Sequence, residues 1–303
     1  MEKIKWSDGV EHWIKKGEVN LFLWNKDSVA PNRGIILFVH GSSMASQPTF
    51  DLHVEGRPYS SAMDWFREKG FDTWTLDNEG YGRSDKKRAI NFDIQNGVDD
   101  LLCAVQYILS TTKARKVHLY GISSGALKAA LFAQQNPGLV DKLILDAFVW
   151  TGQGSPTLAA RKEKLKDYIN HFRRPIDEKF VKSIFERDHP GTADATTVSA
   201  FAQAILSLDD SVPTGTYVDM CTKLPMVDPE KIESSVLLLR GEYDGIASLQ
   251  DLMDFFAKLP NMNKQFSVMR GISHASFQQK NYLMVYELIH SFLTLTHPIY
   301  LGD

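Results

Sequence analysis

The chain has 303 residues, 43% of them hydrophobic, and a formal net charge of -3 from 34 basic and 37 acidic residues. This length could hold two average domains, but α/β architectures of this size are commonly one domain that carries an insertion. A charge so close to balance gives no electrostatic footprint for nucleic acid or an anionic membrane, so neither is expected as a partner. The expected partner is a small molecule.

The two cysteines and the opening residues bear on compartment and metal binding. Cys103 and Cys221 are far apart and form no C-x-x-C spacing, so neither a zinc site nor a disulfide framework is predicted. The first eight residues contain no apolar signal-peptide core, and no stretch approaches about 18 uncharged apolar residues. We therefore expect a cytoplasmic protein without membrane association, and we leave open whether it forms a homodimer.

Strand-like and helix-like segments alternate in the first half of the chain, which is typical of a mostly parallel sheet covered on both faces. The continuous apolar run 35–39 ends in a histidine and a glycine and is typical of a central strand buried on both sides. The other predicted elements are an edge strand over 18–23, a helix over 60–69, a strand over 71–76, a helix over 96–111, and strands over 117–120 and 143–145.

Alternation stops after residue 145 and resumes at residue 236. Between them, 151–233 shows only helical, charge-rich segments punctuated by prolines, and we interpret it as a helical cap inserted into a core of 1–150 and 234–303. The predicted cap helices are 157–172, 177–187, 196–208 and 215–222. After the cap we predict a strand over 236–239, a helix over 249–259, a strand over 265–269 and a helix over 282–295.

The segment Gly121-Ile122-Ser123-Ser124-Gly125 lies between a predicted strand and a helix-like run. G-x-S-x-G in this context is typical of a nucleophile elbow, where glycines two residues either side of the serine let the neighbouring backbone and helix approach closely. Such a turn holds the Ser123 hydroxyl out at the carboxyl edge of the sheet. We therefore predict that Ser123 is a nucleophile.

A serine hydroxyl is a weak nucleophile at neutral pH and needs a base, usually an imidazole oriented by a carboxylate. His274 follows the last predicted strand and Asp244 follows the strand 236–239, so both should reach the sheet edge that carries Ser123. The order Ser, Asp, His is also the order found with nucleophile elbows. We predict His274 as the base and Asp244 as the acid, with Glu242 as second choice and Asp146 as a further alternative.

An oxyanion hole needs two N–H donors. The Ser124 N–H, at the positive end of the new helix, is the predicted first donor. The second should come from the loop after His40-Gly41, with Ser42 N–H as first candidate and Ser43 next. His40 is expected to hold this loop by hydrogen bonds. The long stretch 44–59 that follows either lines an acyl pocket or is a surface excursion.

The turn Gly80-Tyr81-Gly82-Arg83-Ser84 follows the strand that ends at Asp77. It is not a dinucleotide-binding loop, because G-x-G-x-x-G needs glycine where Asp85 stands. We interpret it as a tight turn in which Arg83 pairs with Asp77. The sequence contains neither H-E-x-x-H nor a P-loop lysine motif, so no metal and no cofactor is expected.

Together these features resemble the α/β-hydrolase superfamily over nearly the whole chain. The resemblance implies an eight-stranded, mostly parallel sheet with helices on both faces, a helical cap inserted after the sixth strand, and a Ser/His/acid mechanism without a cofactor. Serine at 123 departs from haloalkane dehalogenases and epoxide hydrolases, which place aspartate there. The features are His40-Gly41, the turn Asp77-x-x-Gly80-x-Gly82-x-Ser84, the elbow at Ser123, Asp244 and His274.

We therefore expect a serine hydrolase that cleaves a carboxylic ester of a small to medium, apolar or aromatic substrate through an acyl-enzyme. An amidase, a lactonase, an acyltransferase or a carbon–carbon bond hydrolase would use the same triad, and a ligand receptor with slow turnover is an alternative of another class. Ser43, Trp150 and Tyr217 are the predicted substrate-binding residues. Arg173 and Arg174 are either a site for a substrate carboxylate or a solvated helix end.

Overall fold

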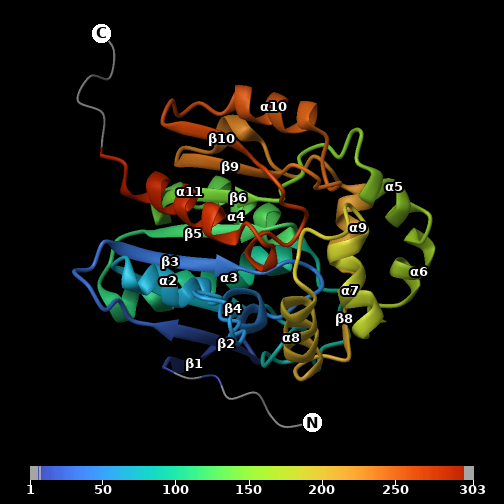
Figure 1. The fold of residues 1–303 in the computed structure, drawn as a ribbon, viewed down its shortest axis with the longest axis horizontal. Coiled ribbons are helices and arrows are strands. Elements are labelled where there is room, and N and C mark those ends of the chain that lie inside the picture. The colour runs from blue at the N-terminus through green and yellow to red at the C-terminus, as the bar shows by residue number, and fades with distance from the viewer. Residues whose placement is uncertain (1–5, 7, 297–303) are drawn as a thin grey trace.

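The computed structural model describes residues 6 and 8–296, and it contains an eight-stranded sheet with helices on both faces (Figure 1). The strand order is β1-β2-β4-β3-β5-β6-β9-β10, and β2 alone runs against the direction of the other seven. The predicted fold class is thereby confirmed. The strands are β1 Val10–Lys16, β2 Val19–Lys26, β3 Gly34–Val39, β4 Phe71–Asp77, β5 Val117–Ile122, β6 Val140–Asp146, β9 Ser235–Gly241 and β10 Lys264–Met269.

The N-terminal hairpin corrects one prediction. The strand expected over 18–23 is not at the edge of the sheet, because β1 pairs with β2 on its outer side. Sequence patterning misses β1 because Ile14 is its single buried residue, so the strand carries no apolar run.

The register of the parallel strands brings their carboxyl ends to one edge of the sheet. Ile122, the last residue of β5, pairs with Asp146 at the end of β6, and Asp146 pairs with Leu239 of β9. Every residue of β5 is buried, as expected for a strand covered on both faces. The loops that follow β3, β5, β6 and β9 therefore start at the same edge.

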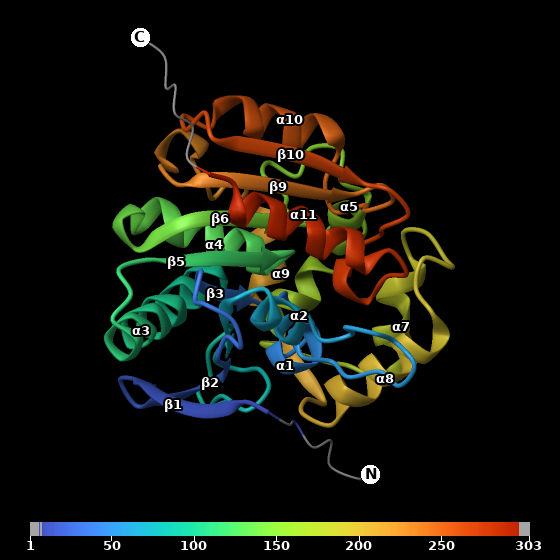
Figure 2. The ribbon, with the colours of Figure 1, turned by 60° about the vertical axis from the view of Figure 1, so that its left-hand side comes forward.

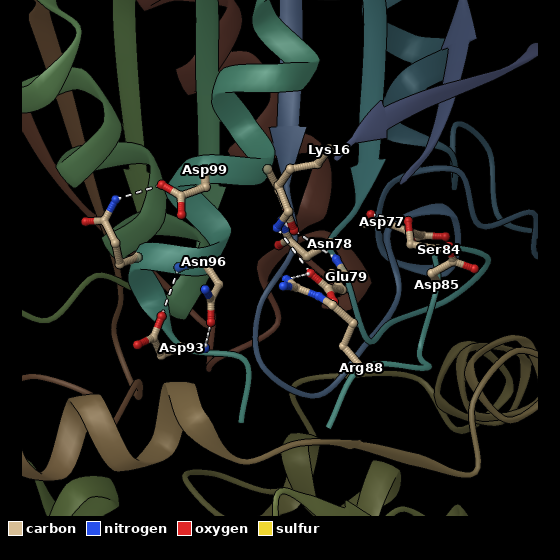
Figure 3. Close-up of polar contacts among 12 residues, drawn as sticks. Lys16, Asp77, Asn78, Glu79, Ser84, Asp85, Arg88, Asp93, Asn96 and Asp99 are labelled. Carbon is tan, nitrogen blue, oxygen red and sulfur yellow. Dashed lines mark hydrogen bonds and ion pairs between the residues drawn. The ribbon is translucent and has the colours of Figure 1, made fainter. Parts of the chain in front are cut away.

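Two groups of helices cover the two faces. On one face α2 and α11 meet through Trp65 and Tyr286, whose ring centroids are 5.4 Å apart, and Figure 2 shows α11 crossing in front of the sheet. On the other face α3 and α4 pack against each other. The N-terminus of α3 is a capping box in which Asp93 accepts from Asn96 N–H at 2.9 Å (Figure 3). These helices are α2 Ala62–Glu68, α3 Ile94–Thr112, α4 Ser124–Gln135, α10 Leu249–Lys258 and α11 Tyr282–Thr294.

Residues 151–233 lie between β6 and β9 in the chain and are called the insertion below. They lie beyond the end of the sheet toward which the β3 arrow points (Figure 1). The insertion contains α5 Pro156–Lys162, α6 Leu165–Asn170, β7 Arg173–Pro175, α7 Glu178–Glu186, α8 Ala195–Leu206, β8 Ser211–Pro213, α9 Gly215–Thr222 and the short 3-10 helix η2 Pro229–Lys231.

Two details of the insertion differ from the sequence prediction. The single helix expected over 157–172 is two helices, because the backbone leaves helical geometry at Lys164, with φ -105° and ψ 11°. Helices alone were expected, but Arg174 of β7 pairs with Val212 of β8 in a two-stranded antiparallel ribbon. Three residues per strand are too few to show the alternation that identifies a strand.

Three further observations concern membrane crossing, the two cysteines and the opening residues. No helix within residues 8–296 combines the length and the apolar character needed to cross a membrane. Cys103 and Cys221 are both half-buried free thiols. The opening residues 1–5, which entered the sequence prediction on targeting, lie outside the described residues.

The approach of α4 to β3 gives a test of the fold. A Cβ built on Gly125 would lie 2.2 Å from the carbonyl oxygen of Val39 and 2.7 Å from that of His40. Both are backbone atoms, so Gly125→Ala must push α4 away from the sheet, and we expect the unfolding free energy to fall by about 3 kcal/mol in urea denaturation. Gly138→Ala is the control, because a Cβ there meets nothing within 4 Å. Equal effects of the two substitutions would contradict this account.

Candidate active site

Ser123 occupies a strained turn between β5 and α4. Its φ of 58° and ψ of -123° lie outside the conformations that residues with a side chain ordinarily adopt, at a cost on the order of 1–3 kcal/mol. The Ser123 N–H donates to the Asp146 carbonyl at 2.9 Å, which ties the turn to the end of β6. The strain directs the hydroxyl away from the sheet, as expected of a nucleophile elbow.

The structure brings the three predicted side chains into one hydrogen-bonded chain. His274 Nε2 lies 3.1 Å from Ser123 Oγ, and His274 Nδ1 lies 3.0 Å from Asp244 Oδ1. When Nδ1 carries the proton and donates to Asp244, Nε2 is free to accept from the Ser123 hydroxyl. All three residues are at most 5% exposed, so the chain is shielded from bulk water.

Asp244 is held in place as an anion. Burial raises the pKa of its carboxyl, but the charge of His274 and the hydrogen bonds from His274 and Ile246 N–H outweigh it and leave the pKa below its usual value. The Arg240 guanidinium donates to carbonyls of the same loop, at 2.9 Å for Gly241 and 3.3 Å for Asp244. These contacts fix the carboxylate that faces the imidazole.

The two alternative acids have other partners. Glu242 accepts from the Gly271 N–H at 2.8 Å and so fixes the loop that leads to His274. Asp146 accepts from the Tyr120 hydroxyl at 2.6 Å and from the Ser276 hydroxyl at 3.0 Å. Both carboxylates therefore support the loops around the site, and the contact with the imidazole belongs to Asp244.

The predicted oxyanion loop lies beside Ser123. A Cβ built on Gly41 would be 3.5 Å from Ser123 Cβ, so the backbone that leads into Ser42 passes directly next to Ser123. Ser42 is held through its other groups: its carbonyl accepts from the Tyr81 hydroxyl at 3.2 Å, and its hydroxyl accepts from that of Thr216 at 2.8 Å. Ser124 opens α4, where its N–H has no carbonyl within the helix to bond.

His40 lies beneath this loop in the hydrogen-bonded position that the sequence predicts. Its Nδ1 bonds the Gly41 carbonyl at 2.8 Å and its Nε2 accepts from the Asn78 N–H at 3.0 Å. Burial, reinforced by the charge of Lys128, lowers the pKa of His40 well below its usual value, so the ring is neutral. A neutral ring with both nitrogens occupied cannot exchange protons with a substrate.

A buried polar network that sequence reasoning missed supports Asn78. Lys128 donates to the Asn78 side chain, and Asn78 donates to Asp100 at 3.2 Å. Figure 3 shows Asn78 next to Glu79, which pairs with Arg88 at 2.6 Å. Burial lowers the pKa of Lys128 to about 7. No sequence signal distinguishes Lys128 from a solvated helix lysine, so it could not have been identified in advance.

The turn after β4 is built differently from the prediction. The Asp77 carboxylate accepts from the backbone N–H of Arg83 at 2.9 Å and from the Ser46 N–H at 2.8 Å. The Arg83 guanidinium pairs with Glu11 instead, so the expected ion pair between Arg83 and Asp77 is wrong. Asp77 thus joins the turn to the loop after β3 through backbone donors.

The loop 44–59 is buried over 44–52 and reaches the surface over 53–59, so only its second half is a surface excursion. It contains a short helix, α1 Ser46–Phe50, whose five residues are all buried. Arg57 donates to the carbonyls of Phe277 at 3.0 Å and Gln279 at 2.7 Å, which surround the 3-10 helix η3 Ser276–Gln278. The loop therefore braces the segment that follows His274.

The predicted substrate-binding residues fall into two places. Ser43 Oγ and Tyr217 OH are 3.0 Å apart, and the Arg174 guanidinium donates to both, at 2.7 and 3.1 Å. Trp150 lies in a packing position: its indole N–H donates to the Val227 carbonyl at 2.9 Å, and its ring contacts that of Phe255. Arg174 is on β7 of the ribbon and not at a solvated helix end.

A family model described as serine aminopeptidase, S33, matches residues 30–281 of the chain. The match begins before β3 and ends after η3, so it spans the turn at Ser123, the insertion and His274. No curated protein matches the chain.

Solved structures share the fold at low sequence identity. An esterase from Exiguobacterium antarcticum superposes with a TM-score of 0.70 at 16% identity, over 94% of this chain and 100% of that one. A carboxyl esterase from Bacillus coagulans gives 0.69 at 16% identity, over 95% and 98% of the two chains. An E-2-(acetamidomethylene)succinate hydrolase gives 0.67 at 18% identity, over 95% and 100%. At these identities the likeness shows the fold alone.

The distinct environments of the acids predict a pH dependence of stability. Burial raises the pKa of Asp146 to about 7 from 3.8. A carboxyl with a raised pKa stabilises the fold fully below its unfolded pKa, and this contribution is lost as the pH rises through its folded pKa. Relative to Asp146→Asn, the wild-type unfolding free energy should fall by on the order of 3 kcal/mol between about pH 4 and 7 in urea titrations. A difference in unfolding free energy between wild type and Asp146→Asn that does not change with pH would contradict the raised pKa of Asp146.

Proposed function

Since the chain belongs to the serine aminopeptidase family of α/β hydrolases, we propose that it is a carboxylic ester hydrolase in which Ser123 is the nucleophile, His274 the general base and Asp244 the orienting acid. The observation that carries the proposal is the unbroken hydrogen-bonded chain from Ser123 through His274 to Asp244. This arrangement suits acyl transfer through a covalent acyl-serine.

In the proposed mechanism, His274 Nε2 takes the proton from Ser123 as its oxygen attacks the ester carbonyl. Asp244 stabilises the imidazolium, and the N–H groups of Ser124 and Ser42 donate to the oxygen that becomes negative. His274 then returns the proton to the departing alcohol. In the second half of the reaction His274 activates a water molecule, which releases the acid from Ser123.

The insertion supports this proposal because it contributes groups around Ser123. Thr216 contacts Ser42, and Thr192 lies 3.2 Å from Ser273, the residue before His274. We propose that the insertion acts as a cap that limits water and selects the substrate, with Ser43 and Tyr217 among the contacts.

Peptide hydrolysis is the second candidate, because the matching family model is described as a serine aminopeptidase. An aminopeptidase must accept the positive N-terminal ammonium of its substrate close to the nucleophile. Next to Ser43 the structure places the cation Arg174, which repels an ammonium group. We therefore favour an ester over an N-terminal peptide.

The nucleophile assignment is tested by labelling with a fluorophosphonate probe and by hydrolysis of short-chain aryl esters. Ser123→Ala should abolish labelling and lower hydrolysis by at least about 10³-fold. Ser124→Ala is the matched control, because it keeps the backbone N–H and removes a buried hydroxyl that has no hydrogen-bond partner within the described residues. Wild-type hydrolysis by Ser123→Ala would reject the proposal.

The acid assignment is tested by a second matched pair. Asp244→Asn should lower kcat by up to about 10⁴-fold, because the amide no longer holds the imidazole in the required tautomer. Asp146→Asn should keep most of the activity near neutral pH, since Asp146 does not contact His274; its amide oxygen accepts from one of the Tyr120 and Ser276 hydroxyls and its amide NH2 donates to the other, which rotates to accept. A larger loss of kcat in Asp146→Asn than in Asp244→Asn would assign the orienting role to Asp146 instead.

A further inference from the structure

A cleft of about 610 Å³ lies between the insertion and the loop that carries Asp244. On one side Tyr217 lines it and bonds Ser43 in the oxyanion loop. On the other side Tyr243 and Gly245, the neighbours of Asp244, line it. The carboxylate of Asp188, which also lines the cleft, lies within 4.8 Å of ligand atoms of both Asp244 and His274. The cleft therefore adjoins the proposed active site at two points.

Two guanidinium groups beside this cleft have no acidic partner within residues 8–296. Arg161 of α5 is only 8% exposed, and its guanidinium carbon lies 4.0 Å from the centroid of the Tyr217 ring. Arg174 of β7 lies 4.5 Å from the centroids of both Tyr217 and Phe180. Among the described residues no carboxylate is within 4.0 Å of either guanidinium. A cation that is removed from water without an anion is costly. Arg161 is buried and Arg174 is half-buried, and no carboxylate of the described residues balances their charge.

Two further observations point to a missing anionic ligand. The Nε of Arg174 is buried and has no hydrogen-bond partner within the part of the chain that the structure describes. Burial would raise the pKa of Tyr217, but the charges of Arg161 and Arg174 outweigh it and lower the pKa to about 7. The phenol thus experiences the positive potential that an anionic ligand would neutralise.

Two other cations, one in the same cleft and one in the core, are paired with carboxylates. Arg187 lines the same cleft but pairs with Asp188 at 3.3 Å. Lys26, which is fully buried in the core, pairs with Asp51 and Asp64 at 2.7 Å each. Lys128 and Lys142 are also buried and have no carboxylate partner among the described residues, but they donate to Asn78 and to the Phe292 and Leu293 carbonyls, and neither lines the cleft. Arg161, in contrast, lines the cleft, and Arg174 contacts Tyr217, which lines it too.

We propose that this cleft binds a carboxylate of the substrate through Arg161 and Arg174, so that the ester cleaved at Ser123 carries a second, free carboxylate. The inference rests on the proposed function. A planar guanidinium matches a carboxylate in shape and charge, and the Tyr217 hydroxyl offers a further polar contact. The aromatic rings of Tyr168, Phe180 and Tyr243 in the lining suit an apolar or aromatic body for the rest of the ester.

The first experiment compares two pairs of esters that differ in one charge. In the acyl pair, para-nitrophenyl hydrogen adipate is compared with the ester in which an isopropyl group replaces the free carboxylate. In the alcohol pair, para-acetoxybenzoate is compared with para-isopropylphenyl acetate. We expect kcat/KM of the charged member to exceed that of its neutral isostere by at least about tenfold in one pair. If kcat/KM in both pairs is equal for the two members or higher for the neutral one, the inference is overturned.

Variants then locate the effect. Arg161→Gln and Arg174→Gln should each lower the charged-over-neutral ratio of kcat/KM, by on the order of tenfold or more. Arg173→Gln is the matched control, because Arg173 lies on the same strand but donates to the Gly80 carbonyl at 3.0 Å and to Ser211. Its ratio should stay at the wild-type value. Circular dichroism and thermal unfolding check that each variant folds, and Arg161→Lys, which keeps the charge, should retain part of the preference.

Binding separates this inference from the proposed function. In Ser123→Ala, benzoate should raise the melting temperature more than benzamide or phenyl phosphate, and Arg161→Gln in that background should remove the difference. Equal shifts for benzoate and benzamide, or a larger shift with phenyl phosphate, would overturn the carboxylate site even if neutral esters are cleaved at Ser123. If benzoate binds but the wild-type protein cleaves no ester and takes no fluorophosphonate label, the carboxylate site is supported and the proposed hydrolase function is rejected.

Discussion

The arrangement of the whole site depends on the close contact of three backbone segments at the turn that holds Ser123. A Cβ on Gly121 would lie 2.4 Å from the Gly125 carbonyl oxygen, and one on Gly125 would lie 2.2 Å from that of Val39. Only glycine permits this approach, and it brings the end of β3, the end of β5 and the start of α4 together. Because the same approach places Gly41 beside Ser123, the proposed nucleophile and the proposed oxyanion loop are positioned by backbone contacts.

Charged side chains have different kinds of partner on the two sides of this turn. On the core side Lys16 contacts the carboxylates of Asp100 and Glu79, and Lys128, whose pKa burial lowers to about 7, donates to the neutral Asn78. A paired or neutralised buried ion needs no ligand, so this network forms a fixed support under the oxyanion loop. On the insertion side the guanidinium groups rest against tyrosine and phenylalanine rings, where an incoming anion still lowers the energy. The contrast separates the support of the turn from the recognition of a ligand.

The parts of the site that could be predicted are those that backbone chemistry imposes on the sequence. Glycines around Ser123 and polar residues directly after apolar strands locate Ser123, Asp244 and His274, because parallel strands end at one edge. The sequence predicts Asp244 before Glu242, but the two lie in one loop two residues apart, and the contact with His274 is what separates them. The ribbon of the insertion and the position of Arg161 could not be predicted, because short strands lack a pattern and an amphipathic helix conceals which polar residue turns inward.

The hydrogen bonds between core and insertion bear on how substrate selection relates to chemistry. Ser43 belongs to the oxyanion loop, yet its hydroxyl contacts Tyr217 and Arg174, both of which the insertion provides. Thr192 of the insertion also reaches the loop of His274 through Ser273. A movement of the insertion would therefore act on both sides of Ser123 at once, on the proposed oxyanion donors and on the proposed base. Because catalysis depends on small differences in these positions, contacts made by a substrate in the insertion are felt in turnover as well as in binding.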